Sequence, residues 1–507
     1  MFLGMLPRRS ALAVGALLAT FQIEAQPATA TNPSSGYSEG WAEDPAGTAT
    51  IAQASEASSH PSASSTSGEA SAYQRALEQL VARAVEVDPW LSGSQHREAA
   101  LQSEAIAFAS LPDPRISLGA ANVPLDTLNF NQEPMTQLAV GISQRFPRGD
   151  SLTLARQHKR DLAAEQPLLR EDRKASIRRA VSLGWLEAWA SQRSIDLIEQ
   201  DYSLFLQLVD AATNRYASAL GLTRQQDVLR AQLELIRLDD RLQRLRQLRD
   251  QQLQQLSQWL GETVLPQQLG PSTTSGATTA ESVDELAVET PDLTPAGLAE
   301  LLNTTLSRAQ RQQRLAQHPA LLAMEQRIHA AQTGVELTRQ KYKPEWGVTA
   351  QYGYRDDDPF GNQRADFFSV GINFDLPLFT ANRQDREMSA VVSRAEALRT
   401  EQQLLQRRLV SELETALTQR ESIEQRLALY ADRLLPQMAE QTNAALNAYN
   451  ADDGDFAEVV RARIDQLNTK IEALGLGTAR EKQHVVIEYL LADGARGQLS
   501  NTHQAQR

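Results

Sequence analysis

The sequence has no cysteine and no apolar run long enough to be a membrane-spanning helix. Without cysteine there is no disulfide framework and no thiol for an N-terminal lipid anchor. A short apolar run at residues 11–19 follows two arginines, and small residues come after it. This order is typical of a secretory signal, with cleavage after Ala25 or Ala30. We therefore expect residues 1–30 to be a signal peptide.

The sequence also lacks the features of an enzyme or a nucleic-acid-binding protein. Its formal net charge of −13 argues against a nucleic-acid partner, because phosphate binding needs a cationic surface. The seven histidines are scattered, and no two have metal-ligand spacing on one helix face. There is no phosphate-binding loop and no zinc-peptidase motif. We therefore expect no catalytic residues, no cofactor and no tightly bound metal.

Three segments have compositions that do not suit a packed core. Residues 31–72 are dominated by serine, alanine, threonine, glycine and glutamate, which predicts a disordered leader. Residues 261–297 are rich in proline, threonine, serine and glycine, which predicts a linker. We expect residues 492–507 to be a flexible tail.

The rest of the chain is a duplication with a nearly constant offset. Asp88-Pro89-Trp90-Leu91 corresponds to His318-Pro319-Ala320-Leu321, 230 residues later. Pro114 and Pro147 recur at the same offset as Pro344 and Pro377. These anchors predict a first repeat at residues 73–260 and a second at 298–491. Each repeat has the order helix, strand, strand, long helix and return helix.

The predicted helices are too long for a globular domain. A run of 67 residues, 150–216, would extend about 100 Å as a helix, a length that implies coiled-coil packing. The corresponding run in the second repeat is 381–449. Leucines in the predicted return helix 224–260 are spaced by threes and fours, as in a packed seam. We expect Pro167 to kink or interrupt the first long helix.

Four segments alternate apolar and polar residues, as β-strands do: about 115–123, 135–146, 345–354 and 367–378. This pattern fits a half-buried soluble sheet or a membrane barrel. Strands of about ten residues favour the barrel, as do seven of the 12 phenylalanines, which fall in residues 114–148 and 343–380. The residues predicted to face lipid are Trp346, Val348, Tyr352, Phe368, Val370, Ile372 and Phe374.

A sheet of four strands cannot close into a barrel, and open sheet edges are not tolerated in hydrocarbon. The smallest membrane barrels need about eight strands, so the chain must oligomerise. A homotrimer would supply 12 strands and bundle three sets of long helices into a tube. We therefore predict a mixed fold, with a trimeric 12-stranded membrane β-barrel continued by an α-helical coiled-coil barrel.

Residues 73–491 resemble the TolC-type outer-membrane efflux proteins. The most specific pieces are Pro112-Asp113-Pro114, the segment 129–136 and the segment 140–147. The resemblance implies a passive trimeric duct through the outer membrane and periplasm, served by a periplasmic adaptor and an inner-membrane pump. Residues 129–147 most resemble members that serve heavy-metal exporters of the resistance–nodulation–division class. Many relatives carry an N-terminal lipidated cysteine. This chain has no cysteine, so it should be anchored by its barrel alone.

In such a duct, the two helix–helix turns form the periplasmic tip. The second turn contains Asp452, Asp453 and Asp455, which are either solvated helix caps or an acidic ring at a cation-selective gate. Arg215 and Arg224 flank the first turn and could pair with this acidic turn. The first turn itself is mostly apolar and is the candidate site for adaptor docking: Leu220, Gly221, Leu222 and Thr223.

The predicted function is therefore an efflux conduit in the outer membrane, with metal cations as the expected cargo. One alternative is the same fold acting as a duct for drugs or for polypeptides of a type I secretion system. Another is a periplasmic coiled-coil scaffold with soluble hairpins and no pore.

Overall fold

The computed structural model describes residues 66–217, 225–261, 307–451 and 454–494, with isolated linker positions between 263 and 302. All of them lie in one compact unit of the chain, Ser62–Arg507. The predicted signal peptide, most of the predicted leader and most of the predicted tail lie outside the described residues. The boundaries predicted for these segments and for the linker therefore stay predictions.

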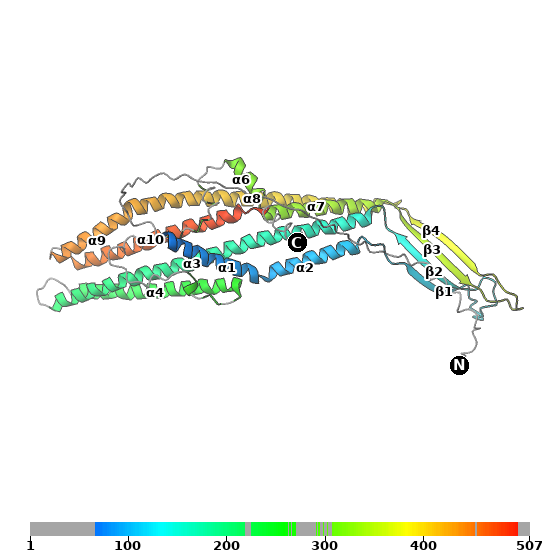
Figure 1. Ribbon diagram of the computed structural model, residues 1–507, viewed down its shortest axis with the longest axis horizontal. Coiled ribbons are helices and arrows are strands. Elements are labelled where there is room, and N and C mark those ends of the chain that lie inside the picture. The colour runs from blue at the N-terminus through cyan, green and yellow to red at the C-terminus, as the bar shows by residue number, and fades with distance from the viewer. Residues whose placement is uncertain are drawn as a thin grey trace, which may run out of the picture. The chain divides into compact units, whose positions relative to one another are not determined.

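The two repeats have the same order of elements (Figure 1). The first repeat consists of α1 (Thr66–Val87), α2 (Pro89–Ala107), β1 (Arg115–Ala121), β2 (Gln137–Phe146), α3 (Ser151–Ala217) and α4 (Gln225–Leu260). A 3₁₀ helix, η1 (Pro266–Leu269), follows α4. The second repeat consists of α6 (Arg308–Leu315), α7 (Pro319–Arg339) with the 3₁₀ turn η2 (Gln340–Tyr342), β3 (Glu345–Tyr354), β4 (Phe367–Asp375), α8 (Gln384–Leu429), the π-helical turn η3 (Tyr430–Leu434), α9 (Leu435–Asn450) and α10 (Phe456–Leu490).

The single helix expected at the start of each repeat is divided in two. The breaks lie at Asp88 and His318, which are the N-caps of α2 and α7. In both cases a proline follows the cap. Proline suits the first position of a helix because its missing N–H would have no partner there, but inside a helix it would break the hydrogen-bond ladder.

The long helix of the first repeat is continuous through its proline. The interruption expected at Pro167 does not occur, because α3 runs from Ser151 to Ala217. Packing holds the helix at this point, since Gln166 and Leu168 on either side of the proline are both buried. The long helix of the second repeat is interrupted instead, by η3 just before Pro436. A π turn relieves the clash between a proline ring and the preceding turn of helix.

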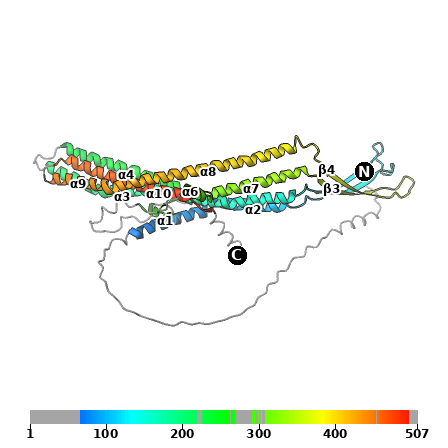
Figure 2. The same ribbon diagram turned by 90° about the horizontal axis from the view of Figure 1, so that it is seen from above.

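Helix α3 is the centre of the packing. It contacts α2 and α4 of its own repeat and α7 and α10 of the second repeat (Figures 1 and 2). Its buried aromatic group consists of Trp185 and Trp189, stacked with ring centroids 6.5 Å apart, and Tyr73 of α1 lies edge-on to both. On α4 the leucine seam is buried at Leu238, Leu242, Leu253, Leu256 and Leu260 and half-buried at Leu245. The N-terminal part of the same stripe is exposed.

The four strands form one antiparallel sheet in the order β1-β2-β3-β4. The pairing of β2 with β3 joins the repeats, with Val140 opposite Tyr352 and Phe146 opposite Trp346. The strands begin where the sequence offset predicts, since β3 starts 230 residues after β1 and β4 starts 230 residues after β2. The predicted mixed fold of a duplicated helix–strand–strand–helix–helix unit is confirmed.

Candidate functional site

The apolar side chains of the sheet are exposed. In β3 and β4 the register places Trp346 opposite Phe374 and Val348 opposite Ile372, so these four side chains share one face. Ile372 is 67 % exposed and Phe374 is 54 % exposed. All seven residues predicted to face lipid are exposed and lie on this face, which we call the apolar face. Their contact with lipid stays a prediction.

The apolar face continues across the other two strands. Ile142 of β2 lies opposite Ala350 of β3 on one side and opposite Ile116 of β1 on the other. Leu118 is 77 % exposed and Ile116 is 70 % exposed. A sheet that packed on a soluble core would bury this face. Here this face is exposed instead.

Apart from Phe367, the opposite face consists of glycines and small or polar residues. A Cβ atom on Gly141 would lie 2.6 Å from Ser117 Oγ, and one on Gly347 would lie 2.5 Å from Asn373 Oδ1. The polar side chains of neighbouring strands therefore cover these glycines, and Gly141 and Gly347 are both buried. We call this the glycine face.

Strands β1 and β4 are the edges of the sheet, and each pairs with only one other strand. Every residue of β1 from Arg115 to Ala120 is exposed, and so is every residue of β4 from Phe368 to Asp375. Each edge presents unpaired backbone N–H and C=O groups, which favour pairing with another strand.

Arg148 joins the ends of the strands where the helices begin. It follows β2, and its side chain donates to the backbone carbonyls of Lys341, at 2.8 Å, and Lys343, at 3.3 Å. It also pairs with Asp375 at the end of β4 and lies 3.7 Å from the carboxylate of Glu345 in β3. The charge patterns in the sequence did not predict this arrangement, because its members are up to 227 residues apart.

Only one residue of the predicted gate has a described side chain. Asp455 is the N-cap of α10, and its carboxylate accepts a hydrogen bond from the Ala457 N–H at 3.1 Å. Asp452, Asp453 and Arg224 lie outside the described residues, as does the side chain of Arg215. The predicted docking turn, residues 220–223, also lies outside them.

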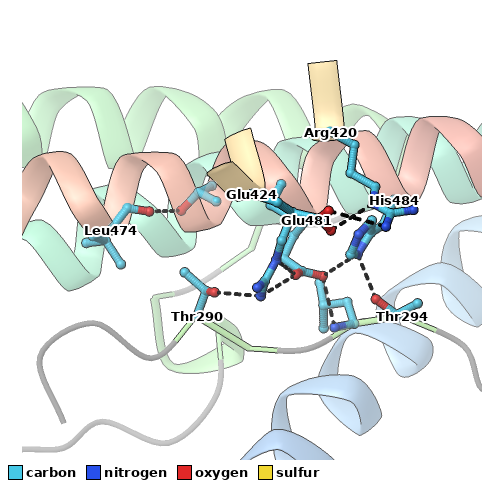
Figure 3. Close-up of polar contacts among 10 residues, drawn as sticks. Thr290, Thr294, Arg420, Glu424, Leu474, Glu481 and His484 are labelled. Carbon is cyan, nitrogen blue, oxygen red and sulfur yellow. Dashed lines mark hydrogen bonds and ion pairs between the residues drawn. The ribbon is translucent and has the colours of Figure 1, made fainter. Parts of the chain in front are cut away.

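A buried carboxylate holds the end of the linker against α10 (Figure 3). The Glu481 side chain is fully buried and accepts hydrogen bonds from the Leu293 N–H at 3.3 Å and from Arg480 at 3.0 Å. Thr294 Oγ1 lies 2.7 Å from His484 Nδ1, one turn along the helix. A Cβ atom on Gly477 would lie 2.4 Å from Thr290 Cγ2, so this close approach needs glycine. We call these contacts the linker clamp.

The described residues contain no group of three or more histidine, aspartate or glutamate side chains placed to hold a metal ion. Among them, no helix is long and apolar enough to cross a membrane.

The comparison with known families agrees with this architecture. Residues 311–492 match the model of the outer membrane efflux protein family. The matched segment lies in the second repeat. The matched family is named for outer-membrane efflux proteins, which agrees with the predicted outer-membrane location and with the prediction that the chain is not an enzyme.

Solved structures of outer-membrane channels share the fold. CusC superposes with a TM-score of 0.64 at 15 % identity, covering 83 % of this chain and 92 % of that chain. VceC from Vibrio cholerae has a TM-score of 0.64 at 16 % identity, with 83 % and 98 % covered. The CmeC channel of Campylobacter jejuni has a TM-score of 0.63 at 13 % identity, with 84 % and 89 % covered. No curated protein matches the sequence.

Proposed function

We propose that three protomers form one outer-membrane channel, in which the apolar face contacts lipid and the glycine face lines the pore. The observation that carries this proposal is the exposure of the apolar face across all four strands. Contact with lipid would remove this surface from water, and small and polar residues suit a water-filled lumen. Lipid then surrounds the apolar face, and water surrounds the glycine face.

The free edges of the sheet require other protomers. In hydrocarbon, each unpaired backbone N–H or C=O costs several kcal/mol, so β1 of one protomer must pair with β4 of the next. Three protomers with four strands each would give the 12-stranded barrel. Two protomers would give about the smallest barrel known, whose interior is filled by side chains and leaves no channel.

The helices also present surface for neighbouring protomers. Helix α4 packs on α3, and its apolar stripe near the first helix–helix turn is exposed, with Leu229 at 58 % and Ile236 at 64 %. Apolar residues at this spacing are typical of a helix that packs against another helix. We infer that a neighbouring protomer covers this stripe in the helical tube.

The proposed cargo is metal cations, delivered by a pump of the resistance–nodulation–division class through a periplasmic adaptor. Two features support it: the resemblance of residues 129–147 to heavy-metal members, and the acidic turn that contains Asp452, Asp453 and Asp455. Three such turns around one axis would attract cations to the entrance. The apolar turn at residues 220–223 is the proposed adaptor contact.

The channel proposal is tested with the full chain, expressed in cells that lack their own efflux channels. We expect it in the outer-membrane fraction as a trimer that conducts ions in planar lipid bilayers. A soluble periplasmic protein without conductance would instead support the scaffold alternative and overturn the proposal.

The cargo is tested separately, by deleting the gene and profiling growth on metals, drugs and dyes. We expect sensitivity to metal cations, restored by the wild-type chain. Sensitivity to drugs alone would keep the channel and overturn the metal cargo.

A further inference from the structure

His318 connects the beginning of one helix to the end of another. As the N-cap of α7, its Nδ1 atom accepts a hydrogen bond from the Ala320 N–H at 3.2 Å. Its Nε2 atom lies 3.1 Å from the backbone oxygen of Tyr489, in the last turn of α10. The residue is completely buried. One ring thus serves both an N–H at the start of α7, which has no partner within its own helix, and a carbonyl at the end of α10, which also accepts from the Ala492 N–H at 3.1 Å.

Only one protonation state of the ring can make both bonds. Nδ1 must carry no proton in order to accept from Ala320, and Nε2 must carry one in order to donate to Tyr489. This is the neutral imidazole with the proton on Nε2. The protonated ring has a proton on both nitrogens, so Nδ1–H would point at the N–H of Ala320 and the cap would be lost.

In the first repeat, the N-cap at the corresponding position is a carboxylate that stays charged. Asp88, the counterpart of His318, caps α2 through the Trp90 N–H at 3.3 Å and accepts from Arg173 at 2.8 Å. The hydrogen bond from Arg173 lowers the pKa of Asp88, so this cap stays ionised at neutral and mildly acidic pH. The two repeats therefore differ in their response to acid in this region.

The groups around His318 do not replace the lost cap. Burial lowers the pKa of His318, against the opposing effects of Asp172 on α3 and Glu412 on α8. Burial raises the pKa of Asp172, which accepts a hydrogen bond from the Tyr489 hydroxyl at 3.2 Å. The pKa of Tyr489 is raised to about 12, and Arg179 lies over its ring. An ionised Asp172 would offset the charge of a protonated ring, but it offers no acceptor to the Ala320 N–H.

We propose that His318 is an acid-sensitive joint between α7 and α10, whose protonation releases the start of α7 from the end of α10. The C-terminal segment takes part, because the Gly494 N–H donates to the Gln317 carbonyl at 3.0 Å in the same turn. Stability from the joint is fully present above the unfolded-state pKa of about 6.5. It is lost as the pH falls from there towards the lower pKa of the folded state.

The test uses hydrogen–deuterium exchange of the full-length trimer in detergent. Between pH 7.5 and pH 5.5, we expect amides near the start of α7 and the end of α10 to exchange about fivefold faster than intrinsic rates predict, as for the loss of one cap. His318→Asn should remove this pH dependence, because an amide side chain can accept and donate without titrating. Asp88→Asn, the matched control, should leave the pH dependence unchanged.

Two outcomes would overturn the proposal. One is the same acid-dependent exchange in His318→Asn as in the wild-type protein. The other needs no variant: exchange of the histidine ring C–H measures the pKa of His318 directly, and we expect a value below 6.5. A value of 6.5 or above would contradict the joint, whether or not the channel proposal holds.

Discussion

Arg148, just after β2, forms an ion pair with Asp375 at the end of β4. Asp375 lies directly opposite Glu345 in the sheet, so Arg148 offsets the repulsion between two carboxylates while it binds two backbone carbonyls. Because these partners belong to the other repeat, the contact holds the two repeats together where the strands meet the helices.

Arg148→Ala should lower the free energy of unfolding by about 1–3 kcal/mol, because several hydrogen bonds to a charged donor are lost. Arg148→Lys should recover only part of this, since an ammonium cannot reproduce the planar fork. Arg145→Ala is the control, because Arg145 is 53 % exposed and makes one long contact with Glu345. Chemical unfolding of the purified protein measures all three, and equal effects at both arginines would contradict the account.

The linker clamp predicts the effect of adding one methyl group at position 477. Gly477→Ala should displace the linker from α10, because the added Cβ would overlap Thr290. We expect faster proteolysis in the linker, measured by limited digestion of the full chain. Thr290→Gly should partly restore protection in the double variant. Gly475→Ala is the control, because a Cβ there meets no atom within 4 Å.

At the second helix turn, substitution of Asp455 should affect the helix cap, whereas substitution of its two acidic neighbours should affect ion selectivity. Asp452→Asn with Asp453→Asn should lower cation selectivity and weaken block by multivalent cations in single-channel recordings. Asp455→Asn should keep the helix cap of α10, whereas Asp455→Ala should cost about 1 kcal/mol. Arg215→Ala or Arg224→Ala should raise conductance by loosening the tip. Unchanged selectivity and block when all three aspartates are replaced by asparagine would mean that the turn is only a solvated cap.

The free edges predict cross-links between protomers. The chain has no cysteine, so any disulfide that forms must join introduced cysteines. Ser117→Cys in β1 should form a disulfide with one of three cysteines introduced in turn on the same face of β4, at Phe367, Ser369 or Gly371. The product should be a covalent trimer on a denaturing gel. Dimers or longer ladders, with no accumulation at three protomers, would contradict a closed ring of three.

Much of the fold could be predicted from local sequence patterns. The strands follow from alternation, and the offset between Pro89 and Pro319 locates the repeats, because both signals depend on neighbouring residues. The sequence does not predict the π turn before Pro436, and it predicts a kink or interruption at Pro167 in a helix that is continuous. A proline's effect depends on the packing of the residues beside it, such as Leu168, and sequence spacing does not reveal that packing.

The contacts that join distant parts of the chain could not be predicted. Arg148 with Asp375 and Glu481 with Leu293 bring together residues about 190 to 230 positions apart. A single charged residue on a long helix looks the same in the sequence whether it is solvated or buried. In the sequence His318 is only an anchor of the repeat, because its contact with Tyr489 requires the end of α10 to lie beside it.

The most direct test of the channel compares two neighbouring residues of β4 that point to opposite faces. Ile372 is on the apolar face and Asn373 is on the glycine face. Arginine at position 372 should cost about 2–4 kcal/mol of folding free energy in lipid if the residue lies near the bilayer midplane, and arginine at position 373 should cost much less. Reversible unfolding in lipid vesicles measures both variants. A large difference in this direction is the predicted result, and equal tolerance at the two positions would contradict the membrane assignment.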